Sequence, residues 1–329
     1  MNGPVRTRRR FLRRTAALAS AALLPAVGRT QGFATRPIRL VVGNAAGGAN
    51  DLVARLIAPV LMERLGQPVV VENKPGAAGN IGLETVIKAP PDGHTLFVSS
   101  SVMLASAHTK AAGLDPVDGL EHVSMICDGY FVFSINETVR AGTLAEFVAL
   151  AKRAPGTINY GTPGAGGNIH VAGELFKLRT GIDIVPIHYK SAGALTADLI
   201  ANQIQMSIQG LAIIGPHIRT GKARPLMIAS RERDRQFPEI PTSVELGIPD
   251  LDSVTNWFGL HAPKGTPAPI VRTLHTLAVE AVANPAVREK LVAGGFVPVG
   301  SSPDEFRARI VRDYRIFGDT VREAKVRSE

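Results

Sequence analysis

The sequence predicts an α/β fold in which two lobes are joined by a hinge of two strands. Its 329 residues are 45% hydrophobic and 20% charged, which is ordinary for a globular protein and enough for two cores. From residue 37 onward, strand-like runs alternate with helical patterns, which favours parallel sheets covered by helices. Two strand-like stretches, residues 130–136 and 253–260, lie where the chain would leave a first lobe and return to it.

The first 32 residues are expected to be a twin-arginine-type signal peptide. "TRRRFLRR" is basic, "TAALASAALLPA" is apolar but too short to span a bilayer, and "AVG" offers small residues for cleavage near residues 28–32. The Thr-Arg-Arg-x-Phe-Leu spacing at residues 7–12 resembles the twin-arginine signal. A disordered basic arm is the alternative. The signal predicts export to the periplasm.

The net charge of +9 is concentrated in that segment. Seven arginines and no acidic residue lie in the first 31 residues, so removing them leaves 9 − 7 = +2. A protein near +2 lacks the basic surface that nucleic-acid binding needs. The single cysteine, Cys127, cannot form an internal disulfide, and it is expected to be a buried core residue, with a catalytic thiol as the alternative.

The elements follow from local patterns. The strand-like runs are "PIRLVVG", "PVVVEN", "HTLFVSS", "HVSMICDGYFVFSIN", "TINYGT", "IDIVPIHY", "IQMSIQG" and "ARPLMIAS". Helical patterns cover residues 50–65, 81–88, 144–153, 169–180 and 195–202. If the chain crosses between lobes at the two stretches named above, residues 33–132 and 255–329 form the first lobe and residues 133–254 form the second. Trp257 lies in the return crossing and is expected to pack near the hinge, with ligand contact as the alternative.

Capping residues indicate where two helices begin. Thr143 and Glu146 form a capping box for the helix at 144–153. Ser302, Pro303 and Glu305 supply an N-cap, a first-turn proline and a matching acid for the last helix. The last helix has one apolar face that is expected to pack on a core, made of Phe306, Ile310, Tyr314, Phe317 and Val321.

Three glycine-rich loops end in similar helix starts. They are "GGAND" at 47–51, "AGNIG" at 78–82 and "GGNIH" at 166–170, and each follows a strand-like run. Glycine lets the backbone approach a ligand closely, and a helix N-terminus offers free N–H groups with a favourable dipole. Such loops suit a carboxylate, and tight strand-to-helix packing is the alternative reason for their glycines.

Several kinds of active site lack their usual motifs. "GNAAGGANDLVARL" has no Gly-Lys-Ser/Thr ending of a phosphate-binding loop, the loop at 164–169 breaks the dinucleotide fingerprint, and no G-x-S-x-G occurs. The eight histidines are dispersed, with no close pair at metal spacing. We therefore expect no enzyme activity, no metal and no cofactor. A secreted hydrolase using the same cleft remains the weaker alternative.

The sequence resembles the substrate-binding proteins of tripartite tricarboxylate transporters, the Bug family. The resemblance rests on "PIRLVVGNAAGGANDLVARLIAPVLMERLGQPVVVENKPGAAGNIGLETVIKAPPDGHTL", "PGTINYGTPGAGGNIHVAGELF", "HYKSAGALTADLIANQIQ" and "WFGLHAPKGTP", and it covers about residues 33 to 320. It implies a type II periplasmic-binding-protein-like fold, two α/β lobes that close on a small organic carboxylate. It also implies delivery to two separately encoded membrane transporter components, and we expect a monomer. A sensor partner uncoupled from transport is the alternative.

The resemblance also implies the ligand-binding residues. In the first lobe these are Asn44, Ala46, Gly47, Gly48, Asn50, Asp51, Gly79, Asn80, Ser99, Ser100 and Ser101. In the second lobe they are Thr162, Gly166, Gly167, Asn168 and His170, to which we add Tyr189 after a strand and Gln209. Asp51 is either a helix-terminal acid or a ligand contact, and His170 is either a ligand hydrogen-bond partner or a solvated surface residue.

Three departures from the family pattern bear on the ligand. Many relatives have Phe-Pro-Pro-Gly-Gly at residues 44–48, where this chain has Asn-Ala-Ala-Gly-Gly, and many have Ser-Ser where this chain has Gly166-Gly167-Asn168. Many carry an acid where this chain has Gln209. Glutamine has no charge to pair with an ammonium group, so di- and tricarboxylates and aromatic carboxylates are favoured over amino acids.

Overall fold

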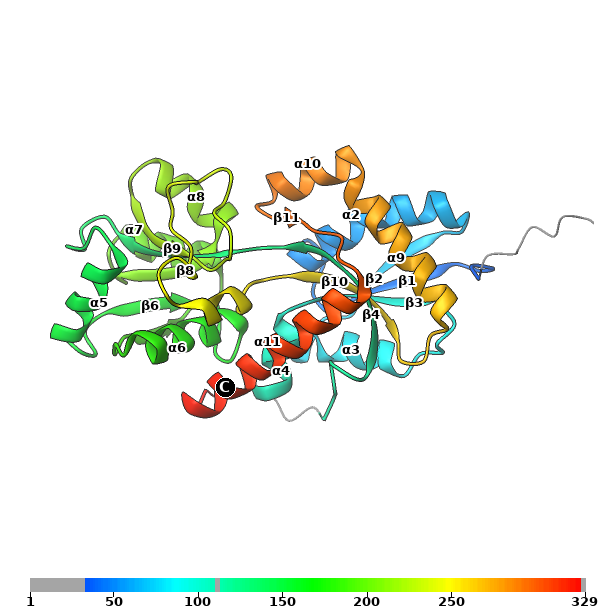
Figure 1. The fold of residues 1–329 in the computed structure, drawn as a ribbon, viewed down its shortest axis with the longest axis horizontal. Helices are drawn as coiled ribbons and strands as arrows, with labels where there is room; N and C mark the ends of the chain where they lie inside the picture. Colours follow the sequence, from blue (N-terminus) through cyan, green and yellow to red (C-terminus); the bar gives the residue numbers. More distant parts are fainter. Residues whose placement is uncertain (1–32, 110–112, 327–329) are drawn as a thin grey trace, which may run out of the picture.

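The chain folds into two α/β lobes, each built on its own sheet. The structure is a computed structural model that describes residues 33–109 and 113–326 (Figure 1). The predicted signal peptide and its cleavage point lie outside the described residues. No helix in the described ranges is long and apolar enough to cross a membrane.

The sheet of the first lobe has six strands in the order β11-β4-β10-β3-β1-β2. The strands are β1 Ile38–Val42, β2 Val69–Asn73, β3 Thr95–Ser100, β4 Leu120–Asp128, β10 Phe258–Pro263 and β11 Val297–Pro298. The helices of this lobe are α2 Ala49–Leu65, α3 Asn80–Ile87, α4 Val102–Thr109, α9 Ala268–Ala283, α10 Pro285–Ala293 and α11 Pro303–Glu323, with a short 3-10 helix η2 at Ala77–Gly79. Helix α2 packs against α9 on one side of the sheet, and α11 packs against α4 on the other.

The sheet of the second lobe has five strands in the order β7-β6-β8-β5-β9. Its strands are β5 Phe131–Asn136, β6 Asn159–Thr162, β7 Val185–His188, β8 Met206–Gly210 and β9 Ala223–Ile228. Its helices are α5 Leu144–Arg153, α6 Asn168–Thr180, α7 Ala192–Ile200 and α8 Leu211–Arg219, followed by the 3-10 helix η3 at Pro249–Ser253.

The chain crosses between the sheets twice, from β4 to β5 and from η3 to β10 (Figure 1). The expectation of parallel sheets is wrong for the two crossing strands, because β5 runs antiparallel to β8 and β9, and β10 runs antiparallel to β3 and β4. A strand that arrives from the other lobe enters at the carboxyl ends of the parallel strands, so it must run the opposite way.

Most local expectations agree with the structure. The five helical patterns correspond to α2, α3, α5, α6 and α7, with the bounds of α5 as predicted and the other ends within three residues. The capping box of α11 is present, with Ser302 and Glu305 bonding each other's backbone N–H. Only half of the predicted capping box forms at α5. The Thr143 side chain accepts from Glu146 N, whereas the Glu146 carboxylate accepts from Gly142 N at 2.6 Å and not from Thr143 N. The fully buried Cys127 is a core residue, as expected.

The last helix and the return crossing pack on each other. Phe306, Ile310 and Phe317 of α11 are fully buried, as the periodicity predicts. Trp257 is also fully buried, with its ring edge-to-face to Phe306 at 5.2 Å between centroids. The packing role expected for Trp257 is therefore confirmed. Gly259 of β10 lies under the same ring, where an added Cβ would come within 2.1 Å of Phe306 Cζ.

We expect Gly259→Ala to lower the free energy of unfolding by about 1–3 kcal/mol, because the new methyl group overpacks the core against Phe306. Gly193→Ala is the control, since a Cβ there meets nothing within 4 Å and alanine favours helix α7. Urea denaturation followed by circular dichroism measures both. Equal stability of the two variants would contradict the packing of α11 on β10.

Candidate functional site

The glycine-rich loops lie at the carboxyl ends of parallel strands. The loop after β1 leads into α2, the loop after β2 leads into α3, and the loop after β6 leads into α6. Two contacts bring the α6 start onto the first lobe: Asn168 Nδ2 donates to Ser101 Oγ at 3.1 Å, and Thr109 Oγ1 donates to Gly166 O at 3.3 Å. The carboxyl edges of the two sheets therefore face each other, which is where α/β proteins bind ligands.

The loops before α2 and α6 have the same backbone geometry. Gly47 and Gly166 both have positive φ, 82° and 72°. The following glycines are the N-caps, with φ/ψ of −78°/172° at Gly48 and −79°/170° at Gly167. In each loop the N–H of the positive-φ glycine donates to a side chain four residues later, Asp51 Oδ2 at 2.9 Å or His170 Nδ1 at 3.0 Å. The sequence similarity between the two loops is therefore a structural one.

The first-turn N–H groups of these helices lie at the edges where the two lobes face each other. The first bonds back to the caps are Leu52 N–H to Gly48 O at 2.9 Å and Val171 N–H to Gly167 O at 3.0 Å. The N–H groups that precede them have no backbone acceptor within the helix, by the geometry of a helix start. Together with the helix dipole they favour an anion between the lobes.

Asp51 supports its loop from inside. Its carboxylate accepts from Gly47 N and from Arg55 Nε at 2.9 Å each, and from Asn73 Nδ2 at 3.0 Å. The hydrogen bond from Arg55 is the main cause that lowers the Asp51 pKa to about 2, against the opposing effect of burial. The carboxylate is thus ionised, and three bonds hold it within its own lobe, as expected for a helix-terminal acid.

His170 occupies the position in the second lobe that Asp51 occupies in the first. Its side chain is buried, so the solvated surface position considered from the sequence is wrong. Burial is the main cause that lowers the His170 pKa to about 4, with nearby His188 and Lys177 adding to it. The ring is therefore neutral, Nδ1 accepts from Gly166 N–H, and Nε2 carries the hydrogen, 4.0 Å from Glu174 Oε1.

A small cavity lies at the carboxyl ends of β1 and β3. Its volume is about 10 Å³, and its lining residues are Gly43, Asn44, Asn50, Ala78, Gly79, Phe97, Ser99, Ser100, Val102 and Met103. That volume holds one water-sized group. Asn50, Ser99 and Ser100 are its buried polar side chains. Together with Asn44 and Gly79, these residues that the resemblance implies for the first lobe are therefore brought to one cavity.

Ser99 is bonded to a buried pair of histidines. Ser99 Oγ lies 2.6 Å from His261 Nε2, His261 Nδ1 lies 2.9 Å from His122 Nδ1, and His122 Nε2 lies 2.9 Å from Val117 O. The Ser–His geometry resembles that of a nucleophile with its base. Here, however, burial lowers the pKa of His261 well below its usual value, and the group that orients it is an imidazole with no negative charge.

Other expected site residues bond within their own lobe. Gln209 is buried in the second lobe, where Oε1 accepts from Thr196 Oγ1 at 2.9 Å and Nε2 donates to Ser207 Oγ at 3.3 Å. Tyr189 donates its hydroxyl hydrogen to Asp198 Oδ2 at 2.7 Å.

The remaining polar candidates are buried, Thr162 at the end of β6 and Asn80 at the start of α3. Thr162 Oγ1 donates to Gly164 O at 3.3 Å. Asn80 Oδ1 accepts from Ser106 Oγ at 3.1 Å, whereas the buried Asn80 Nδ2 has no hydrogen-bond partner among the described residues. Ala46 and Gly47 are the outermost residues, at the tip of the loop before α2.

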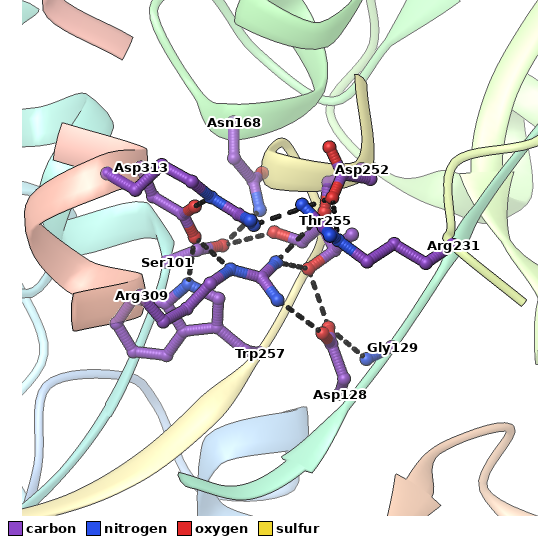
Figure 2. Close-up of polar contacts among 11 residues, drawn as sticks. Ser101, Asp128, Gly129, Asn168, Arg231, Asp252, Thr255, Trp257, Arg309 and Asp313 are labelled. Atoms are coloured by element: carbon purple, nitrogen blue, oxygen red, sulfur yellow. Dashed lines mark hydrogen bonds and ion pairs between the residues drawn. The ribbon is translucent and has the colours of Figure 1, made fainter. Parts of the chain in front are cut away.

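Arg309 of α11 ties both crossings to the last helix (Figure 2). Its guanidinium donates to Asp313 Oδ2 at 2.6 Å, to Thr255 Oγ1 at 2.9 Å and to Asp252 O at 3.1 Å, and lies 3.3 Å from Asp128 Oδ2. Asp128 ends β4 before the outgoing crossing, and Thr255 precedes β10 in the return crossing. The Arg309 side chain is only 17% exposed, and those of Asp128 and Asp313 are 5% and 0% exposed.

This network continues to the start of α6 and to Arg231 in the second lobe. Thr255 donates to Asp128 Oδ1 at 2.6 Å, and its carbonyl accepts from Ser101 Oγ at 2.6 Å, which in turn accepts from Asn168 (Figure 2). Arg231 of the second lobe donates to Asp252 Oδ2 at 2.6 Å. The hinge and the facing loops are therefore joined by one continuous set of hydrogen bonds.

Sequence reasoning did not find Arg309, Thr255 or His261. Arg309 has one local partner, Asp313 four residues along α11. Its other partners Asp128 and Thr255, and the Ser99 partner of His261, lie 54 to 181 residues away along the chain, so no local pattern marks the network. In the described ranges, no group of three or more His, Cys, Asp or Glu side chains is arranged to hold a metal ion.

Comparisons with known proteins find similarity over most of the chain. Residues 53–318 match the model of the tripartite tricarboxylate transporter family receptor. The protein BugT of Bordetella pertussis is 36% identical over 88% of this chain and 90% of its own length. An R. palustris protein solved with adipate is 29% identical, with a TM-score of 0.73 over 89% of this chain and 98% of that one. MatC from Rhodopseudomonas palustris, solved with bound malate, is 28% identical, with a TM-score of 0.70 over 87% and 99%.

We expect His170 to make the protein less stable in acid. The folded pKa of about 4 lies below the unfolded value of about 6.5, so the unfolded chain binds the proton more readily between these values. The contribution of His170 is complete above pH 6.5 and falls by about 2 kcal/mol by pH 5. Urea denaturation at pH 7, 6 and 5 should show a shallower loss for His170→Phe than for the wild type. Identical pH slopes would mean that His170 is not buried as a neutral ring.

We expect Arg309→Met to lower the free energy of unfolding by about 3–5 kcal/mol, because it leaves the buried Asp128 without its cation and Asp313 with Arg312 alone, 3.4 Å away. Arg307→Met is the control, since it removes an exposed ion pair with Asp118 on the same helix. Chemical denaturation compares the two. If both variants unfolded at the same urea concentration, the Arg309 network would not hold the hinge.

Proposed function

Because the chain belongs to the tripartite tricarboxylate transporter receptor family, we propose that it is a receptor that binds a small carboxylate between its lobes and delivers it to two separately encoded membrane components. The family and its solved neighbours are periplasmic solute-binding proteins. The observation that carries the proposal is the pair of matched glycine loops at 47–51 and 166–170, each of which starts a helix at the carboxyl edge of its own sheet, with the α6 start in contact with Ser101 of the first lobe.

The matched loops favour a ligand with two carboxylates. Each loop supplies backbone donors at the start of one helix, so each lobe can hold one anionic group. Malate and adipate, which are bound by two of the solved neighbours, are both dicarboxylates. Gln209 adds no charge to the second lobe, and we propose on that ground that the ligand carries no amine. A carboxylate at position 209 would instead attract an ammonium group of the ligand.

We further propose the lobe bounds and the processing of the chain. The first lobe comprises residues 33–130 and 255–329 and the second comprises residues 131–254, because β5 pairs with β8 from Phe131 onward, two residues before the boundary expected from the sequence. A twin-arginine-type signal over residues 1–32, cleaved near residues 28–32, exports the protein to the periplasm.

The binding residues that we propose are those near the facing loops. In the first lobe they are Asn44, Gly48, Asn50, Gly79, Ser99, Ser100 and Ser101, and in the second lobe they are Thr162, Gly167 and Asn168. Asp51 and His170 act by holding the loops in shape, because each accepts the N–H of the positive-φ glycine in its own loop.

We expect Gly48→Val and Gly167→Val each to abolish ligand binding while the protein stays folded. A Cβ at Gly167 meets nothing within 4 Å, and one at Gly48 meets only Ala45 O at 3.3 Å, so the new side chains extend from the loop backbone into open space rather than into the core. The loss of two or more charge-assisted bonds corresponds to roughly a hundredfold or more in Kd.

Thermal shift with malate, adipate, succinate and citrate, followed by isothermal titration calorimetry, measures the effect. A ligand at a hundred times its Kd adds about 2.7 kcal/mol to stability, so binding is easily seen in the wild type. Gly193→Val on α7 is the control, because its Cβ also meets nothing within 4 Å but lies away from the loops. Full affinity in both loop variants would move the site elsewhere.

A further inference from the structure

The chain of bonds from Val117 to Ser99 has only one direction. Val117 O is a carbonyl, so the His122 Nε2 that lies 2.9 Å away must carry a hydrogen and donate it. A neutral imidazole has one donor and one acceptor, so His122 Nδ1 accepts. His261 Nδ1, 2.9 Å from that acceptor, must therefore donate, and His261 Nε2 must accept. Ser99 Oγ, 2.6 Å from His261 Nε2, donates its hydrogen away from the cavity.

Both rings are held in the neutral form by their surroundings. His122 and His261 are buried, and Phe97 and Phe306 flank the His261 ring with centroids 6.2 and 5.1 Å away. Burial lowers the pKa of His122 to about 4 and that of His261 well below its usual value, so neither ring carries the second hydrogen that would reverse the chain. Protonation of both rings would also place a hydrogen on both of the nitrogens that approach each other, which removes the bond between His261 and His122.

The direction of this chain decides what Ser99 offers a ligand. Ser99 lines the cavity of about 10 Å³ at the carboxyl ends of β1 and β3. Its hydroxyl has one hydrogen, which is committed to His261, so only oxygen lone pairs remain for the cavity. A carboxylate oxygen there would meet another acceptor, whereas a hydroxyl group would find a partner. The cavity has room for one such group.

We propose that Ser99 is a specificity-determining residue that accepts a hydrogen bond from a hydroxyl group of the bound carboxylate. His261 and His122 are positioning residues that fix the direction of the Ser99 hydroxyl without reaching the ligand. This inference rests on the proposed function, because it assumes that the carboxylate binds between the lobes. The loops hold the carboxylates through backbone N–H groups, and Ser99 distinguishes a hydroxylated ligand from its deoxy analogue.

A change at His122, remote from the ligand, should reverse the preference. In His122→Phe the buried His261 Nδ1–H loses its acceptor, so the hydrogen is better placed on Nε2, where Ser99 accepts it. The Ser99 hydrogen is then free to point into the cavity and to donate to an acceptor. Removal of the hydroxyl in Ser99→Ala should leave no preference of either sign.

Isothermal titration calorimetry with two matched pairs tests the proposal: malate against succinate, and citrate against tricarballylate. We expect the wild type to bind the hydroxylated ligand of each pair on the order of tenfold more tightly than its deoxy analogue, which is the contribution of one hydrogen bond. The affinity of the hydroxylated ligand divided by that of its deoxy analogue should fall to about one in Ser99→Ala. For the same ligand pair, this ratio should drop below one in His122→Phe. The control is Ser124→Ala, a buried serine of the same sheet whose hydroxyl bonds Ser301 O at 2.8 Å.

The ratio of the two affinities is the informative readout, because a general loss of packing lowers both members together. A wild-type preference that survives Ser99→Ala, or equal affinities in the wild type, overturns the proposal and leaves the proposed function intact. A bridging water in the cavity, in place of a ligand hydroxyl, would let the deoxy ligands bind as tightly as the hydroxylated ones, and it would therefore overturn the proposal in the same way. Binding of no carboxylate at all would overturn the proposed function itself.

Discussion

The buried guanidinium of Arg309 is the contact on which the arrangement of the two lobes depends. It is desolvated, and a buried charge is tolerated only where every partner is in place. Its partners come from the end of β4, the return crossing and α11 itself, so it fixes both crossings against the last helix. The hinge is therefore braced on the side of the first lobe, and Thr255 links this bracing through Ser101 to Asn168 at the start of α6.

The two matched loops are closed by the same hydrogen bond, made by chemically different side chains. In each, a side chain in the first turn of the helix accepts the N–H of the positive-φ glycine, and so closes the loop without help from a ligand. The acceptor is an ionised carboxylate at Asp51 and a neutral imidazole at His170. Asp51 is paired with Arg55 and His170 is uncharged, so neither loop presents a net negative charge to the anion that the helix N-termini favour.

Local features of the fold follow from the sequence, and long-range ones do not. The helix starts, the α11 capping box and the buried face with Phe306 and Phe317 depend on residues a few positions apart, which periodicity and capping rules describe. The antiparallel crossing strands depend on which edge the chain enters, and no local pattern records that. His122 and His261 are dispersed in the sequence, and only the pairing of β10 with β4 places their Nδ1 atoms 2.9 Å apart.

The same contrast between local and long-range features separates carboxylate binding from ligand discrimination in the candidate site. Glycine loops and helix starts are local motifs that supply N–H donors to any carboxylate, because a backbone amide cannot distinguish one small acid from another. Discrimination must come from the few side chains whose donors and acceptors have fixed directions. Ser99 is such a group, and its direction is set by His261 of the adjacent strand β10, which His122 of β4 orients in turn. A receptor can therefore keep its carboxylate-binding loops and change its ligand by substitutions in a buried hydrogen-bond chain that the loops do not touch.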